Sequence, residues 1–131
     1  MTWRQIKEHK MKLRIKGDSL RIRLTKTEVN TLANTGYLEE QTHFLTGKFV
    51  YALQSADINE PGAELGNNKI TVLLPRQWTL DWPANEVVGF KHQLALGAER
   101  SLFLLVEKDF VCLDETFEDQ SDNYDNPNKS C

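Results

Sequence analysis

The chain has 131 residues, of which 40% are hydrophobic and 27% are charged, and its formal net charge at pH 7 is −3. These values are typical of one soluble globular domain. No apolar run approaches the roughly 18 residues of a membrane span, and the N-terminus lacks the apolar core of a signal peptide. Two cysteines, Cys112 and Cys131, are too few for a disulfide scaffold, although a single bridge between them remains open. We therefore expect a cytoplasmic protein with reduced thiols.

The charge is distributed unevenly along the chain. Residues 1–26 hold nine Lys and Arg against two acids, a net charge of +7. Residues 109–131 hold seven acids against one lysine, a net charge of −6. Such asymmetry predicts either a basic surface with an external anionic partner or two ends of the chain that meet.

Residues 1–10 show no clean apolar pattern, and Met11 offers a second start position. We expect residues 1–10 to be a dispensable N-terminal extension. Residues 11–113 then form a single domain, and residues 114–131 form a C-terminal tail.

The clearest pattern lies in residues 12–24, KLRIKGDSLRIRL. Its apolar residues alternate with cations, which is typical of a half-buried β-hairpin. Gly17-Asp18 suits a type II′ turn, which would pair Lys16 with Ser19. The cations of the polar face are Lys12, Arg14, Lys16, Arg21 and Arg23. In this register Arg14 faces Arg21 and Lys12 faces Arg23, which costs about 0.2–1 kcal/mol per pair unless an anion lies between them.

A short helix is predicted next. Thr25 and Glu28 have the spacing of a capping box, and Gly36 suits the left-handed position that ends a helix. Residues 37–44 and 48–53 then read as a second strand pair. The segment 55–68, SADINEPGAELGNN, reads as the longest loop.

The second half of the chain begins with a predicted strand at residues 69–74. Pro75 suits the first position of a helix, and Trp78 and Trp82 lie on one face of that helix and are expected to pack in the core. Residues 86–96 and 101–106 form the last predicted hairpin, with its turn at Gly97-Ala98.

The strand, helix and hairpin order recurs at an offset of 50 residues, which is compatible with a βαββ duplication. We predict an α+β fold: a mostly antiparallel β-sheet or partly open barrel of about seven strands with two short helices.

The tail is acidic, and Phe117 and Tyr124 are its large apolar residues between Asp114 and Cys131. It has the charge of a disordered segment, but two aromatic anchors favour partial docking on the domain. The candidates for docking are Asp114, Phe117, Glu118, Asp119, Asp122 and Tyr124. Docking on the hairpin cations would supply their missing counter-charges.

The segments LRIKGDSLRIRLTKTEV, VVGFKH and LVEKDFVCLDETFEDQSDNYDNPN resemble a family of short bacterial proteins known only as a domain of unknown function. The similarity spans about residues 11–128. The resemblance implies a compact cytosolic bacterial protein whose acidic tail is part of the domain. It implies no activity, cofactor or partner.

The five hairpin cations, Lys12, Arg14, Lys16, Arg21 and Arg23, are the candidate anion-binding residues. A small anionic ligand or an acidic protein is the expected partner. The sequence does not favour nucleic acid as the ligand, because the hairpin has no aromatic residue for base stacking and the chain is net negative. The structural alternatives are a solvated outer face or neutralisation by the protein's own tail.

No catalytic or metal site is predicted. His92 and Cys112 lack a local signature for nucleophilic catalysis, and the histidines and cysteines lack zinc-ligand spacing. Asp122 and Asp125 do not match a calcium loop. We expect a non-catalytic binding or interaction module without a cofactor, whose oligomeric state the sequence leaves open. The alternative is an enzyme acting on a small phosphorylated or anionic substrate, in which the cations would converge in a concave pocket with an acid or Cys112.

Overall fold

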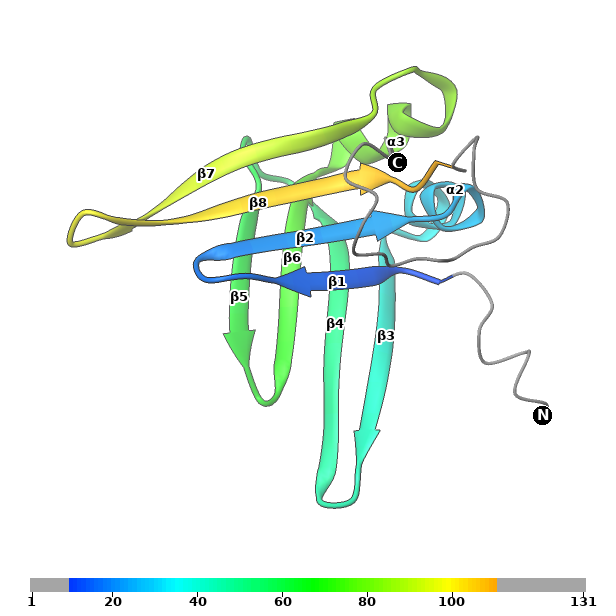
Figure 1. The fold of residues 1–131 in the computed structure, drawn as a ribbon. Coiled ribbons are helices and arrows are strands. Elements are labelled where there is room, and N and C mark those ends of the chain that lie inside the picture. The colour runs from blue at the N-terminus through cyan, green and yellow to red at the C-terminus, as the bar shows by residue number, and fades with distance from the viewer. Residues whose placement is uncertain (1–9, 111–131) are drawn as a thin grey trace, which may run out of the picture.

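The computed structural model of the chain describes residues 10–110 (Figure 1). Its elements in chain order are β1 (Lys12–Ile15), β2 (Ser19–Leu24), α2 (Lys26–Thr35), β3 (Tyr37–Phe44), β4 (Gly47–Ala56), β5 (Gly62–Gly66), β6 (Lys69–Pro75), α3 (Arg76–Asp81), the 3₁₀ helix η1 (Trp82–Ala84), β7 (Gly89–Gly97) and β8 (Arg100–Lys108). The prediction of an α+β fold with two short helices is confirmed.

The eight strands form two four-stranded sheets, with the orders β1-β2-β8-β7 and β3-β4-β6-β5. Each sheet consists of two antiparallel hairpins joined by a central parallel pair, β2 with β8 in one and β4 with β6 in the other. Figure 1 shows the strands of one sheet crossing those of the other, with the helices near one end of both. The chain thus builds two stacked mixed sheets and no closed barrel.

Strand β5 was assigned to a loop by the sequence pattern, and this assignment was wrong. Residues 62–66 pair antiparallel with β6 from Gly62 opposite Leu73 to Gly66 opposite Lys69. The turn between them uses Asn67 and Asn68, both at positive φ (53° and 62°), as a type I′ turn requires. The sequence signal was weak because β5 is a short edge strand with glycine at both ends.

With β5 included, both halves of the chain have the order ββαββ. Each sheet combines one hairpin from each half: β1–β2 of the first half pairs with β7–β8 of the second, and β3–β4 of the first half pairs with β5–β6 of the second. The two sheets therefore have equivalent strand orders. The pairing register also repeats at the offset of 50 residues: Lys12 faces Arg23, and Gly62 faces Leu73. The repeat seen in the sequence is therefore one strand longer than the pattern indicated.

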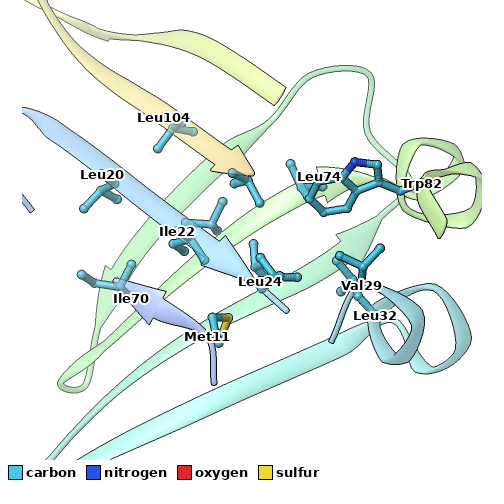
Figure 2. Packing of buried hydrophobic residues seen from close by; sticks show 13 residues of the cluster. Met11, Leu20, Ile22, Leu24, Val29, Leu32, Ile70, Leu74, Trp82 and Leu104 are labelled. Carbon is cyan, nitrogen blue, oxygen red and sulfur yellow. The ribbon is translucent and has the colours of Figure 1, made fainter. Parts of the chain in front are cut away.

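The core lies between the sheets and draws equivalent residues from both halves (Figure 2). The buried residues Leu20, Ile22 and Leu24 of β2 have as counterparts the buried residues Ile70, Val72 and Leu74 of β6. Leu32 and Trp82, also 50 residues apart, both pack into this core. The indole nitrogen of Trp82, a fully buried residue, donates a hydrogen bond to the Val87 carbonyl (2.8 Å). Trp82 is thus a core residue, as predicted.

The capping box of α2 is confirmed. The Glu28 amide donates to Thr25 Oγ1 (3.2 Å), and the Thr25 amide donates to Glu28 Oε1 (2.9 Å). Gly36 ends the helix at φ 79°. In α3, Pro75 takes the N-cap position instead of the first helical position that we expected.

Met11 marks where the packed domain begins in the described part of the chain. Its side chain is 2% exposed, its amide donates to Glu28 Oε2 (2.7 Å), and its carbonyl accepts a hydrogen bond from Tyr51 Oη (2.9 Å). The dispensability of residues 1–10 stays a prediction. Within residues 10–110, neither helix has the length and apolar character needed to cross a membrane.

Candidate anion-binding face

The β1–β2 hairpin has the predicted register. The Lys16 amide donates to the Ser19 carbonyl (3.0 Å), and Gly17 has φ 55°, which the first position of a type II′ turn requires. Arg14 lies opposite Arg21, and Lys12 lies opposite Arg23. The two opposed cation pairs inferred from the sequence are therefore present.

These cations belong to the outer face of the sheet β1-β2-β8-β7. Side chains alternate across a strand, and the residues that alternate with them, such as Ile22 and Val106, are buried in the core. By register the same face also receives Phe103, Leu105 and Glu107 of β8 and Gly89, Lys91 and Gln93 of β7. We call this surface the basic face and define it by its charged and large apolar residues, which are Lys12, Arg14, Arg21, Arg23, Lys91, Phe103, Leu105 and Glu107.

Four of these cations line an open depression of about 470 Å³: Lys12, Arg14, Arg21 and Arg23. The fifth sequence candidate, Lys16, lies at the hairpin turn outside the lining. The depression is a shallow surface feature of the sheet instead of an enclosed pocket.

Glu107 supplies a counter-charge to the two arginines of β2, one from each opposed pair. Its Oε2 accepts hydrogen bonds from Arg21 Nε and Arg23 Nε, both at 2.8 Å. Register explains the geometry, because Glu107 lies directly beside Arg23 across the parallel β2–β8 pair. The two guanidinium groups are thereby held through their Nε atoms by one carboxylate.

The environment keeps Glu107 ionised. Partial burial by itself raises the pKa of a carboxyl group, but hydrogen bonds from Arg23 and Arg21, together with their positive charge, outweigh this effect and hold the pKa of Glu107 below its ordinary value. A carboxylate with a lowered pKa has no proton to donate at neutral pH. Glu107 is suited to positioning the arginines and poorly suited to general acid catalysis.

Gly89 provides the space that Glu107 needs. It lies opposite Glu107 across the β7–β8 pair. A Cβ at Gly89 would lie 2.6 Å from the Val106 carbonyl oxygen and 2.7 Å from Glu107 Cβ, closer than carbon atoms approach in proteins. The absence of a side chain at Gly89 therefore allows β7 and β8 to approach each other beneath this carboxylate.

Two apolar residues on the basic face were not identified from the sequence. Phe103 and Leu105 of β8 are partly exposed and share the face with Arg21, which lies opposite Leu105. The segment SLFLLV is apolar at consecutive positions, so alternation did not reveal which side chains point outward. Their presence adds apolar contact area beside the cations, which the hairpin alone lacks.

Asp109 closes one end of the face. Its carboxylate lies 3.2 Å from Lys12 Nζ, and its amide donates to the Leu24 carbonyl (2.8 Å). Of the five predicted cations, Lys12, Arg21 and Arg23 thus have acidic partners in residues 10–110. Arg14 and Lys16 form no ion pair within that range.

The other predicted residues divide into two groups. Cys112 and the tail candidates Asp114, Phe117, Glu118, Asp119, Asp122 and Tyr124 lie outside the described residues, so tail docking stays a prediction. His92 lies on the opposite side of its sheet from the basic face, in register with the buried Leu104, and its Nε2 is 3.6 Å from Glu60 Oε1. Residues 10–110 contain no cluster of three or more His, Cys, Asp or Glu that could hold a metal ion.

The equivalent face of the other sheet is not basic. The counterparts of Lys12, Arg14, Arg21 and Arg23 in the second half of the chain are Gly62, Glu64, Thr71 and Leu73. On that face Lys69 Nζ donates to Tyr37 Oη (2.7 Å), which in turn donates to Glu39 Oε1 (2.7 Å). The same backbone arrangement therefore forms without a cluster of cations.

Comparison with known proteins gives a family for the chain. The model of a family of unknown function (DUF7009) matches residues 11–128, and the chain belongs to that family. No curated protein and no solved structure matches it.

Proposed function

We propose that this member of a family of unknown function is a non-catalytic binding module, and that its basic face binds a small ligand bearing phosphate groups. The observation that carries the proposal is the open depression lined by four cations, two of which the Glu107 carboxylate holds in place. Arginine suits such a site because its planar guanidinium group donates paired hydrogen bonds to phosphate oxygens.

The internal symmetry supports a functional origin of the charge. The second half of the chain builds the same hairpin with Glu64 and Thr71 where the first half has Arg14 and Arg21. Opposed cations destabilise a strand pair when they have no counter-charge. The fold does not need these arginines, so their concentration on one face favours a role in binding.

Glu107 and the apolar residues indicate how a ligand would be held. Because Glu107 bonds both arginines through Nε, their terminal NH₂ groups remain for a ligand, since within residues 10–110 they donate no hydrogen bond to protein. Arg14 adds a cation that no acid of residues 10–110 neutralises. Phe103 and Leu105 offer an apolar surface for the organic part of a ligand.

The proposal is tested by isothermal titration calorimetry of the full-length protein with inorganic tripolyphosphate at low salt. Arg14→Gln removes one cation without breaking an ion pair of residues 10–110, and loss of about 1 kcal/mol would weaken binding about fivefold. Lys48→Gln, on the outer face of the other sheet, is the matched control and should leave binding unchanged. Equal affinity of wild type and Arg14→Gln would refute the proposal, as would an equal loss in both variants.

The same titration separates binding from the enzymatic alternative. A binding module returns the probe intact, so free phosphate should not accumulate after prolonged incubation. Release of phosphate that Arg14→Gln abolishes would instead favour an enzyme acting on phosphorylated substrates.

A further inference from the structure

We propose that the acidic segment 114–125 of the same chain occupies the basic face and competes there with external anions. This inference rests on the proposed function, because it names what regulates that site. The first supporting observation is where the described chain ends. Asp109 is bound to Lys12 and its amide to the Leu24 carbonyl, so Phe110 leaves the domain at one end of the basic face.

Charge complementarity is the second observation. The basic face carries five cations, and the acids paired with them in residues 10–110 are Glu107 and Asp109. The segment that follows Phe110 carries six acids before its first cation, Lys129. The excess of positive charge on the face is thus matched by the excess of negative charge on the segment that begins beside it.

Reach is the third. A strand advances about 3.3 Å per residue, so Arg21 lies roughly 7 Å beyond Arg23 along β2. Five extended residues span up to about 17 Å, which allows Asp114 to reach Arg21 from Asp109. Phe117 is three residues further along and can reach Phe103 at the far side of the face. The order of acids and aromatic residue in the segment therefore fits the order of cations and apolar residues on the face.

Apolar contact is required as well as charge. Exposed ion pairs contribute little individually and are screened by salt. Phe103 and Leu105 give Phe117 an apolar surface, so the segment is held by burial of its ring and oriented by its acids. A tethered segment has an effective concentration of about 1 mM. If its own dissociation constant for the face is about 0.1 mM, it weakens the apparent affinity of an external anion about tenfold.

Cross-linking of the full-length protein tests whether the segment lies on the face. A carbodiimide joins lysine amines to carboxylates in direct contact. We expect links from Lys12 and Lys91 of the basic face to acids of residues 114–125, within one chain, and none from Lys48 or Lys69 of the other sheet. Links mainly to Lys48 and Lys69, or between two chains, would overturn the proposal, as would the absence of any link to the segment.

Binding of inorganic tripolyphosphate tests the competition. A variant with Asp114→Asn, Glu118→Gln and Asp122→Asn should bind the probe several-fold more tightly than wild type at low salt. A matched variant with Glu64→Gln, Glu86→Gln and Glu99→Gln loses the same charge elsewhere and should change affinity less than twofold. The difference in affinity between the Asp114→Asn, Glu118→Gln, Asp122→Asn variant and wild type should vanish at 1 M salt, where the Debye length is about 3 Å.

The outcomes separate this inference from the proposed function. If both triple variants bind the probe equally while Arg14→Gln weakens binding, the face binds anions and the tail does not compete. If Arg14→Gln has no effect, the proposed function fails, and the cross-links still decide whether the segment lies on the face.

Discussion

Replacing Glu107 by glutamine should lower the stability of the protein and strengthen its binding of anions. The carboxylate accepts hydrogen bonds at 2.8 Å from two guanidinium groups. A hydrogen bond to a charged group contributes about 1.5–3 kcal/mol when well buried. The arginine side chains are 32% and 37% exposed, so screening lowers each contribution to about 1 kcal/mol. The expected loss is about 2 kcal/mol, or roughly 6–10 °C in Tm for a domain of this size.

The stability loss should depend on pH in a defined direction. The folded-state pKa of Glu107 lies below its ordinary value of 4.5, so its contribution is present above the unfolded pKa and is lost as the pH falls through the folded pKa. Thermal melts of wild type and Glu107→Gln should therefore differ at pH 7 and converge as the pH falls below 4.5 and through the folded-state pKa of Glu107. Glu64→Gln, an exposed acid on the other sheet, is the control and should match wild type throughout.

The same variant should bind tripolyphosphate more tightly. Removing a negative charge about 6 Å from a bound phosphate is worth about 0.7 kcal/mol per unit charge in water, a factor of about three in affinity. Stability and affinity thus move in opposite directions. An unchanged Tm at pH 7, or a Tm loss that is the same at both ends of the pH range, would show that the Glu107 bonds do not contribute as the geometry indicates.

Three further predictions concern the scaffold. Thr25→Ala should lower the free energy of unfolding by about 1 kcal/mol in urea titrations, because it removes the N-cap of α2, whereas Thr27→Ala should cost much less. Glu40→Gln should raise Tm at pH 7 but not near pH 3.5. Burial, with repulsion from Glu28 and Glu39, raises the folded-state pKa of Glu40 above 4.5. The ionised carboxylate therefore destabilises the fold as the pH rises above 4.5, whereas the protonated form at lower pH does not. Deleting residues 1–10 should leave Tm within a few degrees, since an ammonium group at Met11 still donates to Glu28. A loss of cooperative unfolding would show that the folded domain needs residues 1–10.

The features predicted correctly from the sequence are those that local rules determine. The register of the β1–β2 hairpin follows from a two-residue turn and strict alternation, and the start of α2 follows from a capping box. The burial of Trp82 was expected from its position four residues after Trp78, although Trp82 begins η1 and does not belong to α3. Each depends on residues close together in the chain.

The features that were missed depend on residues far apart in the chain. Glu107 meets Arg21 and Arg23 from 86 and 84 residues away, through a parallel strand pair that no turn specifies. The counter-charge was expected from the acidic tail, and within the described residues Glu107 and Asp109 supply part of it. The outward position of Phe103 was missed for the same reason. Only the pairing of β2 with β8 determines which side chains of that apolar strand point outward.

The internal repeat separates what the fold requires from what was free to change. At the offset of 50 residues, Ile22 matches Val72 and Leu24 matches Leu74; both pairs are apolar and buried, because both sheets must close the same core. On the outer faces the correspondence ends: Arg21 matches Thr71 and Arg23 matches Leu73. A surface position without a packing partner accepts many residue types at little cost in stability. The cluster of cations is confined to one of the two equivalent faces, where Arg21 and Arg23 take the Glu107 carboxylate as their counter-charge. Because the other half of the chain builds the same backbone arrangement without such a cluster, its restriction to one face favours the binding role proposed above.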